Sequence, residues 1–96
     1  LASPEAKKLA LYIGKDSLPA FLAQIRDCNN ATELALVVVS MLDQENKLTE
    51  ETVVRSSFIQ LLLPFATKIT SGRSVNNIRA RINDALIARR KSHPKR

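Results

Sequence analysis

The chain has 96 residues, of which 45% are hydrophobic and 25% charged, a composition typical of one folded globular domain. Its formal net charge of +6 favours a polyanion or an acidic surface as the partner. The single cysteine, Cys28, excludes an intramolecular disulfide and a multi-cysteine metal site, and two glycines are too few for a Walker-type phosphate loop.

The N-terminal part of the chain predicts two short helices. Ser3 can accept a hydrogen bond from a first-turn amide, and Pro4 has no amide to leave unpaired, so we expect a helix over 4–13. Gly14 is a natural stop for this helix. A second helix is expected over 17–27, because apolar residues recur there at helical spacing. The apolar side of the first helix is expected to consist of Leu9, Leu11, Tyr12 and Ile13.

The third predicted helix spans residues 31–43. Asn30 precedes Glu33 by three residues, close to the pattern of a capping box. The valines at 37–39 also suit a buried strand, but no other segment shows the alternation that a partner strand requires. Nearly every side of this segment is apolar, so we expect a central helix that its neighbours enclose.

The last two predicted helices span residues 50–63 and 74–90. Pro64 should end or kink the first of them. The fold class that follows is all-α, a compact bundle of five helices around a buried third helix. We expect a single helical domain over 1–91 and a flexible basic tail over 92–96.

Positive charge gathers at the C-terminal end of the chain. Residues 1–60 have a net charge of −2, whereas residues 61–96 have a net charge of +8. Arginine predominates there, and its planar fork suits phosphate and guanine. We therefore expect contact with nucleic acid through this end. The predicted contact residues are Arg73, Asn76, Asn77, Arg79, Arg81, Arg89, Arg90 and Lys91.

This predicted interface has measurable consequences. If about four phosphates are neutralised, log K should fall against log salt with a slope of about −3 to −4 on duplex DNA. Arg79 and Arg81 lie outside the apolar stripe of the last helix, so replacing both by alanine is expected to reduce this slope and leave the fold intact. Ser92 follows Arg89 and Arg90 in a pattern similar to the sites of basophilic protein kinases, and a phosphate there would weaken contact with a polyanion.

The alternative function is a protein-interaction module. The helix predicted over 50–63 carries a continuous apolar set, part of which can form a groove for an amphipathic helix or a second copy of the chain. The candidate groove residues are Phe58, Leu62 and Phe65, each of which also suits the core. In this alternative the basic end of the chain binds an acidic protein surface.

We expect no catalytic site, metal or cofactor. The only histidine, His93, lies in the predicted tail, where it has no rigid platform for a triad or a zinc site. The apolar runs are too short to cross a membrane. The expected location is intracellular, and nuclear in a eukaryote, with the chain forming part of a larger nucleic-acid-associated or transcription-related protein.

Overall fold

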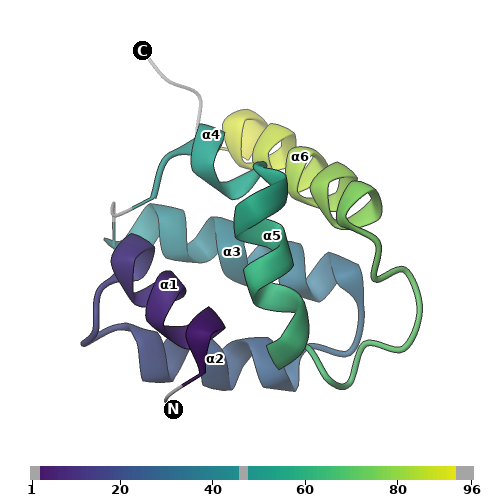
Figure 1. The fold of residues 1–96 in the computed structure, drawn as a ribbon. Coiled ribbons are helices and arrows are strands. Elements are labelled where there is room, and N and C mark those ends of the chain that lie inside the picture. The colour runs from purple at the N-terminus through teal and green to yellow at the C-terminus, as the bar shows by residue number, and fades with distance from the viewer. Residues whose placement is uncertain (1–2, 46–47, 93–96) are drawn as a thin grey trace.

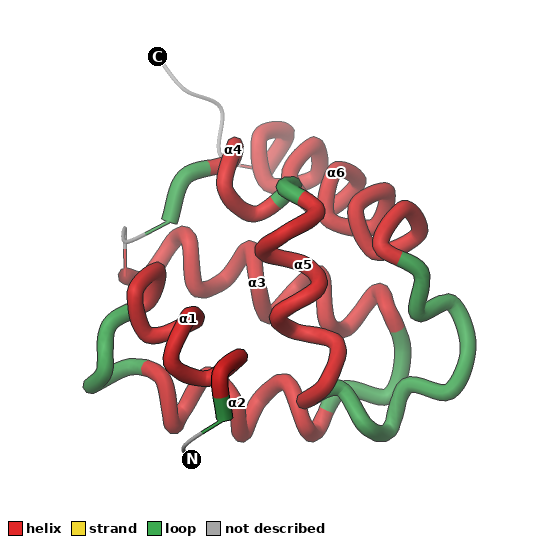
Figure 2. Tube along the Cα trace, in the orientation of Figure 1, coloured by secondary structure: helices red, strands yellow, loops and turns green. Residues whose placement is uncertain are grey.

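The computed structural model describes residues 3–45 and 48–92 of the chain. Within these ranges the backbone is helical and contains no strand, which confirms the all-α prediction (Figures 1 and 2). The elements are α1 (Pro4–Ile13), α2 (Leu18–Asp27), α3 (Ala31–Glu45), α4 (Glu50–Val53), α5 (Ser56–Leu62), the 3-10 helix η1 (Leu63–Phe65) and α6 (Val75–Ser92).

Helix α3 runs through the middle of the bundle. Figure 1 shows α2 below α3 and α6 above it, while α5 crosses in front. Helix α3 packs against α2, α4 and α6, and α5 packs against α1 and α6. The radius of gyration of 12.6 Å is that of a single compact unit of this length.

One apolar core receives side chains from all of the longer helices. Within the part of the chain that the structure describes, no polar or charged residue is buried, so the core needs no internal hydrogen bonds. The aromatic rings of Tyr12 and Phe58 meet edge to face at 5.3 Å and join α1 to α5. The largest fully buried side chains are Leu9, Ile13, Phe21, Leu22, Ile25, Leu34, Phe58, Ile59, Leu62, Ile69, Ile78 and Ile82.

The predicted starts of the first and third helices are confirmed by their capping contacts. The amide of Ala6 donates to the Ser3 hydroxyl at 3.2 Å. At the start of α3 the amide of Glu33 donates to Asn30 Oδ1 at 2.9 Å, and the Glu33 carboxylate accepts from the amide of Asn29. These contacts satisfy amides that the first turn of a helix leaves without a backbone partner.

Helix α3 is central, but its neighbours do not enclose it. Leu34 and Val38 are fully buried, whereas Leu36 has 55% of its surface exposed. The central position of α3 is therefore as predicted, and only the side that carries Leu36 faces solvent. A helix with apolar residues on every side can still expose one of its faces, because a single exposed leucine lowers the stability of a protein only slightly.

The helix predicted over 50–63 is two helices. Arg55 adopts an extended backbone conformation, with φ −75° and ψ 139°, and separates α4 from α5. The segment around it contains Val53, Val54, Ser56 and Ser57, which are all weak helix formers. The predicted effect of Pro64 is confirmed, because α5 ends at Leu62 and Pro64 lies in the following 3-10 turn.

Helix α6 runs to Ser92, two residues beyond the predicted end at 90. Of the predicted tail over 92–96, residues 93–96 lie outside the described residues. None of the described helices is sufficiently long and apolar to span a membrane.

Candidate functional site

The start of α6 uses both predicted asparagines locally. The amide of Asn77 donates to the Ser74 hydroxyl at 3.1 Å, and the Asn77 side chain donates to the Gly72 carbonyl at 2.7 Å. Gly72 has a positive φ of 69°, and a Cβ there would lie 2.8 Å from the Asn77 amide nitrogen. The side-chain oxygen of Asn76, Oδ1, accepts a hydrogen bond from the Arg79 guanidinium at 2.8 Å. Both side chains thus hold the loop and the first turn of α6.

Arg73 is a structural residue of the loop between η1 and α6. Its guanidinium donates to the carbonyls of Leu63 and Ile69 at 2.8 and 2.9 Å, and also to the carbonyl of Ala66. The carbonyls of Leu63 and Ala66 also accept backbone amides, so the guanidinium supplies a second donor to each and ties the turns of this loop together. Both terminal nitrogens of Arg73 are thus engaged within the loop, which disfavours the predicted phosphate contact at this side chain.

Arg79 forms hydrogen bonds that connect α6 to the break between α4 and α5. Its Nε donates to the Val54 carbonyl at 2.9 Å, which is one of the carbonyls left open where the helix stops. Its terminal nitrogens donate to Asn76 and to the Ser56 hydroxyl. Removing this side chain leaves the Val54 carbonyl without its donor, so we expect the alanine replacement of Arg79 and Arg81 to lower the stability of the domain.

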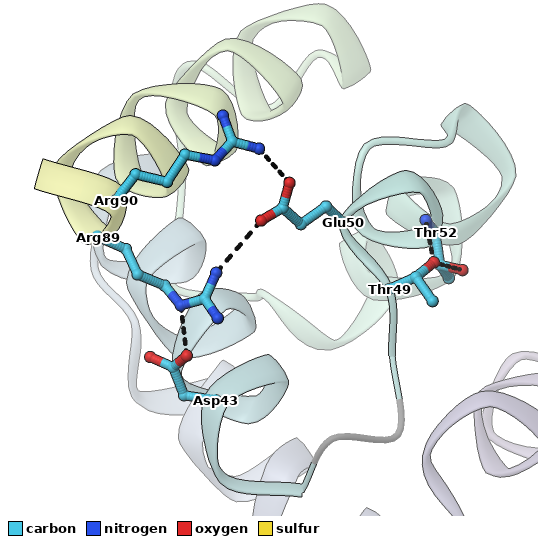
Figure 3. A network of polar contacts seen from close by, with 6 residues as sticks. All are labelled: Asp43, Thr49, Glu50, Thr52, Arg89 and Arg90. Atoms are coloured by element: carbon cyan, nitrogen blue, oxygen red, sulfur yellow. Dashed lines mark hydrogen bonds and ion pairs between the residues drawn. The ribbon is translucent and has the colours of Figure 1, made fainter. Parts of the chain in front are cut away.

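Arg89 and Arg90 join the C-terminal end of α6 to α3 and α4. Arg89 pairs with Asp43 and, at 3.3 Å, with Glu50, and Arg90 pairs with the other oxygen of Glu50. Figure 3 shows the Glu50 carboxylate facing both arginines, with Arg89 reaching between the two acids. We call this ion-pair cluster the α6 anchor; its members are Asp43, Glu50, Arg89 and Arg90.

The two remaining cations of the predicted interface are more open to solvent. Arg81 lies 3.6 Å from Asp84 one turn along the same helix, and both side chains are largely exposed. Lys91 is exposed near the end of α6. The predicted set is thus not assembled as one basic surface, because Arg73, Arg79 and the anchor arginines are directed towards groups of the domain itself.

The three residues predicted to line an apolar groove do not lie together at the surface. Phe58 and Leu62 are fully buried in the core, so they do not line an open groove. Phe65 is half-buried, and the Arg26 guanidinium lies 5.9 Å from its ring centroid. Helical periodicity identifies the apolar stripe of a helix, but it does not show whether other helices cover that stripe or leave it exposed as a groove.

A groove does lie beside α5, on the side that faces α1. It has a volume of about 600 Å³. Its apolar lining comes from Leu11, Tyr12 and Leu61, and the ring of Tyr12 is held by its edge contact with Phe58. Glu5, Lys8, Ser57 and Gln60 complete the lining. This hollow is named the α1–α5 groove.

Leu11 is the most exposed large apolar side chain of the described residues, with 87% of its surface accessible. It was expected on the apolar side of its helix. On a helical wheel of about 100° per residue, however, Leu11 lies about 160–200° from the buried Leu9 and Ile13. Leu11 also borders a second hollow on the other side of α1, which includes Lys7, Lys15 and Leu18.

Lysines surround Leu11 on both sides. On the same wheel Lys7 and Lys8 lie within about 60° of Leu11. Among the residues that the structure describes, no acidic side chain pairs with Lys7, Lys8 or Lys15. The N-terminal helix therefore presents positive charge that the domain itself does not neutralise.

Comparison of the chain with known protein families, with curated proteins and with solved structures gave no match.

The lone cysteine belongs to the core. Cys28 is buried, and its thiol donates to the Gln24 carbonyl at 3.2 Å. Burial raises the pKa of the Cys28 thiol, and the carboxylates of Glu33 and Asp27 raise it further. The thiol is therefore protonated at neutral pH and fills space as a small apolar side chain.

The α1–α5 groove was not among the sites predicted from the sequence. The signal was present, because an outward leucine between lysines is visible once α1 is placed on a wheel with Leu9 and Ile13 facing inwards. The partner helix α5 was not visible, since the contact between α1 and α5 depends on tertiary packing.

Proposed function

We propose that this domain is a protein-interaction module that binds an acidic amphipathic helix in the α1–α5 groove. The observation that carries the proposal is the group of lysines without acidic partners around Leu11, beside a hollow of about 600 Å³ with an apolar lining. Grooves of this kind bind the apolar stripe of a helix through residues spaced by about one turn.

The apolar component of binding comes from the exposed surface of Leu11 and from the half-buried Tyr12 and Leu61. Covering a leucine side chain contributes about 1.5–3 kcal/mol. Ser57 and Gln60 at the groove edge provide hydrogen-bonding groups without charge. A partner helix can therefore place its apolar stripe between α1 and α5, with its own charged residues beside Lys8 and Glu5 at the groove.

The charged component selects an acidic partner. Lys8 borders the α1–α5 groove, and Lys7 and Lys15 border the hollow on the other side of Leu11. Acidic residues flanking the apolar stripe of a bound helix would lie near these ammonium groups. Charges at the rim of an interface mainly increase the association rate and exclude like-charged partners.

Affinity for a synthetic peptide tests this function. The probe is a fluorescent amphipathic peptide with leucines at one-turn spacing and glutamates beside them, titrated with the domain at low salt. Replacing Leu11 with Ser should weaken binding by about tenfold or more, since the loss of the leucine contact removes about 1.5–3 kcal/mol. The double change Lys7→Glu with Lys8→Glu should weaken it by about fivefold or more, and less at high salt.

The matched control is Leu36→Ser, which removes another exposed leucine, one that lies beside Asp27 and Glu33. It should leave peptide affinity unchanged. A version of the peptide with lysines in place of glutamates should not bind. Equal binding of a glutamine version would contradict the acidic partner, and equal loss of affinity in Leu36→Ser would contradict the groove.

Nucleic-acid contact through the C-terminal end stays a prediction. The guanidinium groups of Arg73 and Arg79 each donate three hydrogen bonds within the domain, which disfavours a phosphate surface centred on them. Duplex DNA, titrated in the same assay, distinguishes the two functions. Tight duplex binding that survives the double charge reversal of Lys7 and Lys8 would favour the nucleic-acid interface.

A further inference from the structure

We propose that Ser92 is a phosphorylation site for a basophilic protein kinase and that its modification loosens the α6 anchor. Ser92 is the last residue of α6 and is exposed. Arg89 and Arg90 precede it by three and two residues, and Lys91 is its neighbour. An acidic kinase cleft would recognise these cations, while the serine hydroxyl is open to the solvent.

The chemical step is an ordinary phosphoryl transfer from ATP. The Ser92 Oγ forms a bond to the γ-phosphorus, and the bond from that phosphorus to the oxygen bridging to the β-phosphate breaks. ADP leaves, and the kinase base accepts the hydroxyl proton. The domain contributes the accepting hydroxyl and the arginines that position the segment.

The structure places this site within reach of the anchor. Arg89, whose side chain is 29% exposed, contacts Asp43 and Glu50, and Arg90 contacts Glu50. All four side chains are partly open to solvent, so the ion pairs are weak individually and can open locally. A kinase can therefore bind Arg89 and Arg90 after the last turn of α6 has separated locally from Asp43 and Glu50.

The phosphate then acts on the anchor in two ways. It adds a charge of about −1.5 to −2 at the negative end of a helix, which disfavours the last helical turn. It also competes with the carboxylates of Asp43 and Glu50 for Arg89, because it lies one turn away on the same helix. The buried Ile82 and Leu86 remain in place, so the effect is confined to the end of α6.

Kinase treatment of the whole folded domain tests the proposal. We expect one phosphate per chain by intact mass after incubation with ATP and a kinase that prefers arginine at the third and second positions before serine. The change Ser92→Ala should abolish this incorporation. Amide hydrogen exchange near 88–92 and 50–53 should then become about two- to fivefold faster in the phosphorylated domain, as expected from releasing an exposed ion-pair cluster.

A second variant tests the role of the anchor. Glu50→Gln weakens its hold on both arginines and should increase the rate of Ser92 phosphorylation by about two- to fivefold, whereas Arg81→Ala, outside the anchor, should not. Absence of phosphate in the wild-type domain, or a phosphate that persists in Ser92→Ala, would overturn the assignment of the site. Unchanged phosphorylation in Glu50→Gln or unchanged exchange after modification would overturn the link to the anchor.

Discussion

Replacing Val38 with Asp should destabilise the domain by more than about 4 kcal/mol, because it buries a carboxylate without a partner. Val38 lies on α3 with none of its surface exposed, and the buried residues around it offer no polar side chain. A domain of this size has a total stability of about 5–15 kcal/mol, so the variant is expected to be largely or wholly unfolded at moderate denaturant. Denaturant titration followed by far-UV circular dichroism measures the loss.

The matched control for this prediction is Leu36→Asp on the same helix. Leu36 is 55% exposed, so the new carboxylate stays hydrated and the expected loss is below about 1 kcal/mol. Similar stability of the two variants would show that α3 is rotated about its axis relative to the structure described above.

Replacing Arg73 with Ala should cost about 2–4 kcal/mol, which is large for a residue at the surface of a loop. Three backbone carbonyls, those of Leu63, Ala66 and Ile69, would lose a charged donor at once. The fully buried Ile69 is carried by this loop, so a change in the loop also disturbs the core. Thermal unfolding at neutral pH provides the measurement.

Two further variants separate this effect from a general loss of positive charge. Arg81→Ala removes the same charge from an exposed i to i+3 pair and should change stability by less than about 0.5 kcal/mol. Arg73→Lys should recover only part of the loss, since an ammonium lacks the fork of a guanidinium. A melting temperature equal to that of wild type for Arg73→Ala would refute the structural role of this residue.

Local sequence signals were sufficient to predict the positions of most helices and the caps of three of them. Ser3, Asn30 and Thr49 all cap helices by contacts within three residues, so their role can be read without tertiary information. The break at Arg55 was missed, since the apolar stripe continues across it. The weak helix formers on both sides of Arg55 were the available signal. The hydrogen bond from Arg79 to the Val54 carbonyl at this break could not be predicted, because the two residues are 25 positions apart in the chain.

The role of the basic C-terminal end could not be predicted from charge alone. Arg89 and its partner Asp43 are 46 residues apart, and Arg73 binds carbonyls rather than acids. A net charge of a segment does not distinguish cations that hold the fold from cations available to a partner. Conversely, Lys7 and Lys8 lie in the half of the chain with net negative charge, yet the structure leaves them without acidic partners among the described residues.

Amide chemical-shift mapping by NMR tests the location of the binding surface most directly. The domain, labelled with nitrogen-15, is titrated with the acidic amphipathic peptide, and the perturbed amides are placed on the structure. The expected result is a continuous set of perturbations along α1 and α5, centred on Leu11 and Leu61, with small changes in α6. Perturbations concentrated in α6 around Arg81, Arg90 and Lys91, with α1 unaffected, would contradict the α1–α5 groove as the binding site.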